Sequence, residues 1–241
     1  MAIRMKLGNC MRAWISKNIF NAMIFKTIDN KTLAVIKAIV FLLALTPLSR
    51  LGLQAYQDAL GANPIEKITR TTGYWTLTFL IITLCATPLR HLLGWIWLIR
   101  LRRMLGLFAF FYACLHFSTY LVLDQFFDWE SIIKDIAKRP YITVGFPAFL
   151  LMIPLAVTST DGMIRILGGK RWRLLHRLVY LCAIGGVIHY WWLVKKDLTN
   201  PITFAAILGL LLSIRLLIWL KSLRKLRLMA NAGNFSLIWK I

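Results

Sequence analysis

Six apolar segments, separated by short polar stretches, constrain the fold of this chain more than any other feature. They cover residues 33–53, 74–87, 104–123, 142–158, 174–194 and 202–220. Most approach the roughly 20 residues that an α-helix needs to cross about 30 Å of hydrocarbon. The second segment is short, and it could begin nearer Thr69 or extend to Trp97. The pattern predicts an all-α integral membrane protein that folds as a bundle of six transmembrane helices.

The composition supports the membrane class. Of the 241 residues, 59% are hydrophobic, which excludes an ordinary soluble domain. The chain has 30 Lys and Arg against 9 Asp and Glu, a formal net charge of +21. These basic residues cluster between the apolar segments rather than on one face, so we expect no nucleic-acid binding. Cys10, Cys85, Cys114 and Cys182 form no CxxC pair, and they indicate neither a disulfide framework nor a zinc site.

The charges of the polar stretches predict the orientation of the chain. The N-terminal tail, the loops after the second and fourth segments, and the C-terminal tail are strongly basic. Residues 54–73 and 124–141 instead balance acidic against basic side chains, and only Lys195 and Lys196 depart mildly from the pattern. The positive-inside rule therefore predicts a multi-pass protein with both termini in the cytoplasm.

The chain divides into three parts. Residues 1–32 form a basic cytoplasmic segment in which apolar residues recur at helix-like spacing. That spacing fits a helix lying on anionic lipid, and it fits a frayed tail equally well. Residues 33–220 form the six-helix transmembrane domain, and residues 221–241 form a basic cytoplasmic tail. We expect no signal peptide, and the basic loops contain no GxGxxG or Walker-type motif for a nucleotide.

Three histidines lie within apolar segments: His116 in the third, and His176 and His189 in the fifth. An ionisable side chain is costly inside a membrane, and a metal centre would give it a reason to be there. The third and fifth segments run in the same direction, which puts His116 and His189 both about two-thirds of the way across. Two imidazoles at one depth on neighbouring helices are what bis-histidine haem ligation requires. A lone histidine would more often be a hydrogen-bonded core residue.

Two glycines precede His189 by four and three residues. Gly185 and Gly186 would let a flat porphyrin, or another helix, approach the backbone of the fifth segment.

His176 is harder to interpret than the other two. It lies 13 positions before His189, so it is expected near the cytoplasmic face and turned about 140° away on a regular helix. The matching positions before His116 hold Arg102 and Arg103 instead of a histidine. His176 could therefore ligate a second haem with a different partner, bind a quinone, or snorkel. We interpret His91 as interfacial, and Arg215, near the cytoplasmic end of the last segment, as snorkelling.

Four motifs occur in order along the chain. They are GANPIEKITRTTGYWTL, RLRRMLGLFAFFYACLHFSTY, RPYITVGF and TSTDGMIRILGGKRWRLLHRLVYLCAIGGVIHYWW. In order and spacing they resemble the MsrQ (YedZ) family, the haem-binding membrane subunits of the bacterial MsrPQ methionine sulfoxide reductase system. That family belongs to the ferric reductase-like transmembrane superfamily. The resemblance covers about residues 33–220 and excludes the basic N-terminal extension.

The resemblance implies cofactors, partners and a location. It implies a b-type haem (heme b), with His116, His176 and His189 as the motif histidines, together with an association with FMN. It implies electrons from the quinone pool or a flavin donor, and a heterodimer with MsrP. MsrP is a periplasmic molybdopterin subunit that reduces methionine sulfoxide in oxidised periplasmic proteins. The location is the bacterial inner membrane, and the catalytic step is expected on the partner. Two alternatives stay open: a stand-alone transmembrane ferric or cupric reductase, and a cofactor-free membrane scaffold.

Overall fold

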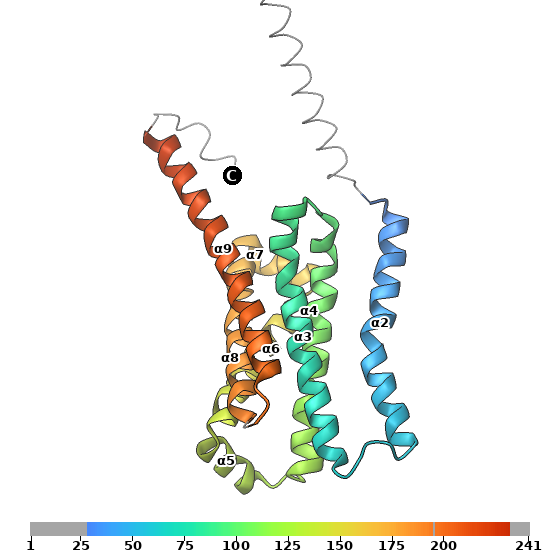
Figure 1. The fold of residues 1–241 in the computed structure, drawn as a ribbon. Coiled ribbons are helices and arrows are strands. Elements are labelled where there is room, and N and C mark those ends of the chain that lie inside the picture. The colour runs from blue at the N-terminus through green and yellow to red at the C-terminus, as the bar shows by residue number, and fades with distance from the viewer. Residues whose placement is uncertain (1–27, 195, 232–241) are drawn as a thin grey trace, which may run out of the picture.

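The computed structural model describes residues 28–194 and 196–231, and these residues fold as a helical bundle without a β-strand (Figure 1). Its elements are α2 (Asn30–Tyr56), α3 (Pro64–Leu93), α4 (Trp97–Ser118), the π-helix η1 (Thr119–Asp124), α5 (Trp129–Lys138), α6 (Pro140–Val157), α7 (Asp161–Leu175), α8 (Leu178–Leu193) and α9 (Thr199–Asn231). Most of the expected N-terminal segment, and residues 232–241 of the expected C-terminal tail, lie outside the described residues.

The helices are long and apolar enough to confirm a multi-pass membrane protein. Five candidate spans are Asn30–Tyr56, Pro64–Leu93, Trp97–Asp124, Pro140–Val157 and Thr199–Arg224. The pair α7 and α8 is bent by 41° at its break, and it gives a sixth span if both helices are counted as one. The fold class is therefore as the apolar pattern predicts.

Several helix boundaries differ from the sequence-based expectation, most clearly those of the second span. The second span is a helix of 30 residues that begins at Pro64 and ends at Leu93. Extension to Trp97 is wrong, because Gly94 adopts a left-handed conformation (φ 72°) that ends α3, and Trp97 begins α4. The short helix α5 was not expected at all. Its Asp128 cap accepts hydrogen bonds from the backbone N–H groups of Glu130 and Ser131.

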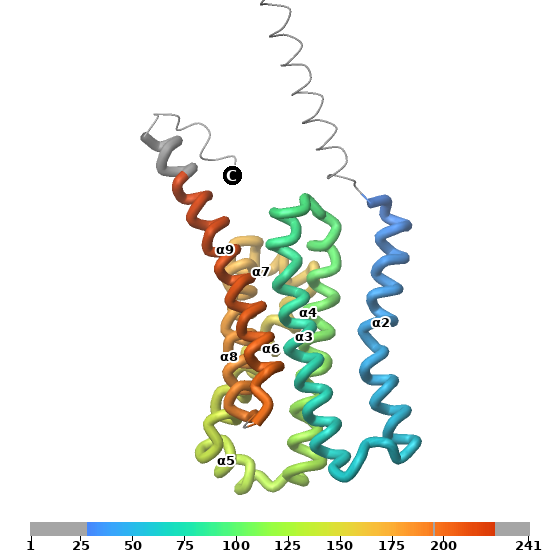
Figure 2. The backbone as a smooth tube through the Cα atoms, viewed as in Figure 1, coloured from blue at the N-terminus to red at the C-terminus, as the bar shows by residue number. Residues whose placement is uncertain are grey.

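The bundle is built from two closely packed helix pairs. Helix α3 packs along α4, and α6 packs along α8 (Figure 2). Helices α2 and α9 lie at opposite edges of the view in Figure 1, with α5 at one end of the bundle and α7 at the other. We refer to these as the α5 end and the α7 end. Tyr112 on α4 is 1% exposed, and its hydroxyl donates to the Ala44 carbonyl 2.7 Å away on α2, which ties the edge helix to the core.

Arg215 on α9 turns into the bundle, which corrects the expectation that it snorkels. Proline has no backbone N–H, so Pro88 within α3 leaves the carbonyl of Leu84, four positions earlier, without its helical donor. Nη2 of Arg215 donates to that carbonyl at 2.6 Å, and Nη1 donates to the Tyr180 hydroxyl on α8. One arginine therefore joins three helices and replaces a hydrogen bond that proline removes.

Candidate functional site

The structure brings His116 and His189 together. His116 lies in the last turn of α4 and His189 in the second half of α8, and their ring centroids are 6.0 Å apart. The two ring planes are nearly perpendicular, at 86°. Each of the two histidines is half-buried.

A backbone carbonyl holds each imidazole. Nδ1–H of His116 donates to the Thr69 carbonyl on α3 at 2.8 Å, and Nδ1–H of His189 donates to the Tyr141 carbonyl on α6 at 2.7 Å. Within the described part of the chain, neither Nε2 makes a hydrogen bond. A metal-bound histidine commonly donates its second ring N–H in this way, which fixes the tautomer and leaves a lone pair for the metal.

A glycine lies beside each of these carbonyls. Gly73 and Gly145 come four residues after Thr69 and Tyr141, and in a helix the side chain at that position lies next to the carbonyl. A Cβ at Gly73 would lie 2.9 Å from Cε1 of His116, and a Cβ at Gly145 would overlap Nδ1 of His189. Both histidines therefore reach a helix backbone only because a side chain is missing there.

The glycines singled out from the sequence have different roles. Gly186 lines the cavity beside the histidines. Gly185 faces α6, where an added Cβ would come within 3.1 Å of the Ala148 Cβ. Gly185 therefore permits close packing of two helices, which was one of the two expected roles.

A cavity of about 580 Å³ opens beside the two rings. Most of its wall is apolar or aromatic, including Phe117, Phe149 and Met152, and it is enclosed by α3, α4, α6 and α8. Charged side chains gather in its lining at the α5 end: Glu66, Arg70, Asp124 and Arg139. A mostly apolar pocket of this size with a few polar groups is typical of a cofactor site.

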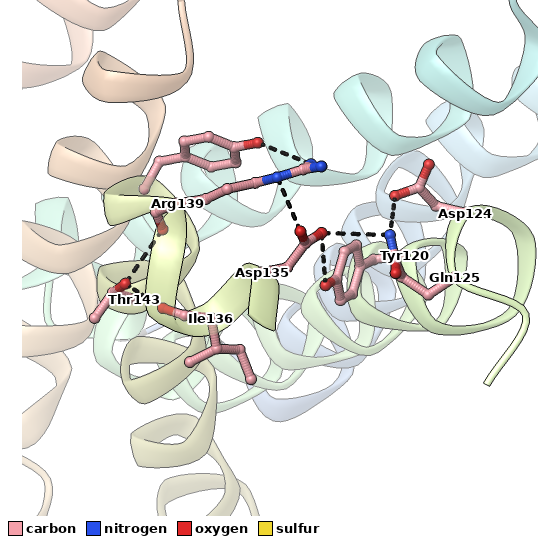
Figure 3. A network of polar contacts seen from close by, with 8 residues as sticks. Tyr120, Asp124, Gln125, Asp135, Ile136, Arg139 and Thr143 are labelled. Carbon is pink, nitrogen blue, oxygen red and sulfur yellow. Dashed lines mark hydrogen bonds and ion pairs between the residues drawn. The ribbon is translucent and has the colours of Figure 1, made fainter. Parts of the chain in front are cut away.

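A polar network lies at the α5 end (Figure 3), and its members Tyr120, Arg139 and Tyr141 line the cavity. Arg139 forms an ion pair from Nε to Asp135 at 3.1 Å and donates from Nη1 to the Tyr141 hydroxyl at 3.3 Å. Asp135, whose side chain is 16% exposed, also accepts from the Tyr120 hydroxyl and from the Gln125 amide, both at 3.4 Å. The hydrogen bond to Tyr141 raises the pKa of Arg139. Sequence reasoning missed this network because it depends on where α5 folds.

The π-helix η1 begins three residues after His116. Its wider turn changes the direction in which side chains leave the helix, and Tyr120 and Asp124 of η1 both line the cavity. Single π-turns occur frequently at functional sites, and no pattern in the sequence indicated this one.

His176 lies apart from the other two histidines, at the α7 end. It ends α7 at the break before α8, and it is not in the cavity lining. Its ring stacks on Trp172 at a centroid distance of 4.0 Å, and its Nε2–H donates to Thr158 Oγ1 at 3.1 Å. Thr158 can accept this bond because its own hydroxyl donates to the Pro154 carbonyl. His91 is exposed and lies 3.2 Å from the Arg90 guanidinium, away from the cavity lining.

The two neighbouring rings suit a metal that brings most of its own ligands. Among the described residues, no group of three or more His, Cys, Asp or Glu side chains could hold a metal ion. Two metal–nitrogen bonds of about 2 Å each, with about 1 Å from each nitrogen to its ring centre, would put the ring centres of two imidazoles that held one metal between them roughly 6 Å apart. The observed 6.0 Å matches that separation, and the cavity provides room for a macrocycle. The residues present therefore fit a haem.

Comparison with known proteins agrees with this geometry. Residues 72–187 match the family described as "Ferric reductase like transmembrane component". The chain is 60% identical over 185 residues to the "Protein-methionine-sulfoxide reductase heme-binding subunit MsrQ" of Herminiimonas arsenicoxydans, covering 76% of this chain and 85% of that protein. Proteins of the same name from Azospira oryzae and Rhodospirillum rubrum are each 59% identical, over 77% and 73% of this chain and 80% and 85% of their own lengths. This chain therefore belongs to the MsrQ family and carries a ferric reductase-like transmembrane domain.

Proposed function

We propose that this chain is a haem-binding electron-transfer subunit, with a b-type haem held between His116 and His189. The observation that carries the proposal is the 6.0 Å approach of the two rings, each with its Nδ1–H committed to a backbone carbonyl. The relatives' printed name, which describes a heme-binding subunit, supports the same assignment. When bound, the haem iron supplies one-electron redox chemistry.

The chain's own residues orient the ligands and control their surroundings. The carbonyls of Thr69 and Tyr141 hold the rings in one tautomer and increase the basicity of Nε2. Phe117 and Phe149 stack at a centroid distance of 4.8 Å in the cavity wall, where they exclude water. An apolar shell of this kind influences the reduction potential of the metal that it surrounds.

We further propose that electrons leave at the α5 end for MsrP, a periplasmic molybdopterin subunit that reduces methionine sulfoxide in oxidised proteins. The position of the histidine pair, whose supporting carbonyls lie near the α5-end starts of α3 and α6, supports this direction. The basic loops at the α7 end support a bacterial inner-membrane location with cytoplasmic termini. Reduction of the sulfoxide is then the partner's chemistry, and no catalytic residue is assigned to this chain.

The α7 end is the proposed entry point for electrons from the quinone pool or a flavin donor, with FMN associated there. His176 is the candidate residue for a second haem, a quinone or a flavin at this end. Two observations support this role. The ring of His176 stacks on Trp172, and among the described residues only its Nε2 takes part in a hydrogen bond, which leaves Nδ1 without a partner there.

A reconstituted electron-transfer assay tests the function. The full chain is reduced by a quinol or by a reduced flavin in the presence of purified MsrP and methionine sulfoxide, and, in parallel, of a ferric chelate. We expect electrons to reach the sulfoxide through MsrP. Reduction of the ferric chelate without any turnover of MsrP would instead favour the stand-alone metal reductase. A colourless preparation without iron would favour the cofactor-free scaffold.

A further inference from the structure

Two arginines flank the two carbonyls that hold the histidines. Arg70 directly follows Thr69 on α3, and Arg139 lies two residues before Tyr141 at the start of α6. Both side chains line the cavity at its α5 end. Each histidine therefore has its supporting carbonyl and one cation delivered by the same short segment of chain.

Each guanidinium keeps N–H donors that no residue of the described chain uses. Arg70 forms an ion pair from Nη2 to Glu66 at 2.5 Å, and Arg139 forms one from Nε to Asp135. A guanidinium has five N–H donors, so each arginine retains several after these contacts and the contact of Arg139 with Tyr141. The side chains of Arg70 and Arg139 are 64% and 48% exposed, which leaves their remaining donors accessible.

We propose that Arg70 and Arg139 bind the two carboxylates of the haem, one each, at the α5 end of the cavity. This inference rests on the proposed haem site between His116 and His189. Protoporphyrin has two carboxylate side chains on one edge, and arginine binds carboxylates through charge-assisted hydrogen bonds. The rest of the described cavity wall offers no other arginine or lysine.

The acidic residues at the same end restrict where the carboxylates can lie. Glu66 and Asp124 line the cavity there, and their negative charges repel a ligand carboxylate that comes close to them. Glu66 pairs with Arg70 and Asp135 pairs with Arg139, each acid four positions before its arginine. The ion pairs therefore orient the arginines, and the free donors recognise the ligand. The macrocycle is therefore oriented with the edge that carries its two carboxylates toward Arg70 and Arg139.

A comparison of two porphyrins tests the proposal. The full chain, produced without haem, is titrated with iron protoporphyrin IX and with its dimethyl ester, which lacks both negative charges. We expect the native chain to prefer the free acid, and Arg70→Gln and Arg139→Gln each to lower that preference about tenfold. Arg139→Lys, which keeps the charge, should restore much of the preference. The ratio of the two affinities is the readout, because a general loss of stability weakens both porphyrins together.

Matched controls lie close to each arginine, on α3 and α5. Lys134→Gln removes a cation of α5 that is paired with Glu130 four positions earlier but does not line the cavity, and Lys67→Gln removes an exposed cation of α3. Neither should change the preference. An unchanged preference in both arginine variants, or equal binding of acid and ester by the native chain, would overturn the arginine assignment while leaving the haem site intact. Failure of the native chain to bind either porphyrin would overturn the haem site itself.

Discussion

The imidazole of His189 lies against the backbone of Gly145, so close that a Cβ on this glycine would overlap Nδ1 of the ring. The same relationship joins His116 to Gly73 on another helix. In each pairing the histidine packs against the first half of the neighbouring helix, α3 for His116 and α6 for His189. A backbone carbonyl of that helix accepts the ring N–H. The site is thus built twice, once from α3 and α4 and once from α6 and α8.

Replacing Gly145 with alanine should displace His189 from the Tyr141 carbonyl. The added methyl group occupies the position of the ring, so the histidine loses both its hydrogen bond and its orientation. We expect Gly145→Ala to lower the affinity of the chain for haem by about tenfold or more, as mutation of a ligand-supporting group commonly does. Gly209→Ala on α9 is the control, because nothing lies within 4 Å of its added Cβ. Native affinity in a haem titration of Gly145→Ala would contradict this account of the glycine.

Substitutions at Arg215 and Pro88 should have non-additive effects on the free energy of unfolding. Arg215→Leu leaves the Leu84 carbonyl without a donor, which costs about 1–3 kcal/mol for a buried group. In a Pro88→Ala background the new backbone N–H can donate to that carbonyl, so the same change should cost less. Unfolding of all four proteins by denaturing detergent measures the coupling. Equal costs of Arg215→Leu in both backgrounds would show that the arginine does not replace the missing bond.

The backbone amides of helix α5 should become less protected from hydrogen exchange in acid. Hydrogen bonds from the Ser131 hydroxyl and from the backbone N–H groups of Ser131 and Glu130 lower the pKa of Asp128, the cap of this helix. Because the folded pKa is lowered, the stabilisation is present above the ordinary pKa of about 4 and is lost as the pH falls through the folded value. Hydrogen exchange of the α5 amides at several pH values measures this loss. Asp128→Asn keeps a capping side chain without titration, so its α5 should lack this acid-dependent step.

His176→Ala should slow the entry of electrons without weakening haem binding at the site between His116 and His189. The residue is absent from the cavity lining, so the haem that we propose between His116 and His189 should stay bound, and dithionite should still reduce it. Reduction by quinol or flavin should slow, because the α7 end is the proposed entry point. Thr158→Val is a milder variant that removes the hydrogen bond to His176 Nε2. Native rates of quinol and flavin reduction in His176→Ala would remove His176 from the proposed path.

The sequence predicts the part of the site that depends on helix direction and depth. His116 and His189 lie in apolar segments that run the same way, and the two rings meet in the structure. The supporting groups could not be found in this way, because Thr69 and Tyr141 belong to other helices whose facing sides are set only by packing. A signal does exist: TRTTG and YITVG each place a glycine four residues after the carbonyl that accepts the histidine.

Other features escaped prediction because they depend on residues far apart in the chain. Arg215 looked like a snorkelling residue at the end of a span, since its acceptor, the Leu84 carbonyl, is on a helix much earlier in the sequence. Helix α5 has too few apolar residues to attract attention as a span, although its Ile132 is buried and its Ile136 lines the cavity. Both cases are tertiary effects that no local pattern shows.

Haem content of the histidine variants tests the central claim most directly. Iron and pyridine haemochrome are quantified per chain for the native protein, for His116→Ala and His189→Ala, and for His91→Ala as an exposed control outside the cavity lining. We predict that either of the first two changes abolishes binding of the haem that we propose between α4 and α8, together with its absorption spectrum, and that His91→Ala leaves both unchanged. Native haem content and spectrum in His116→Ala or His189→Ala would contradict the account.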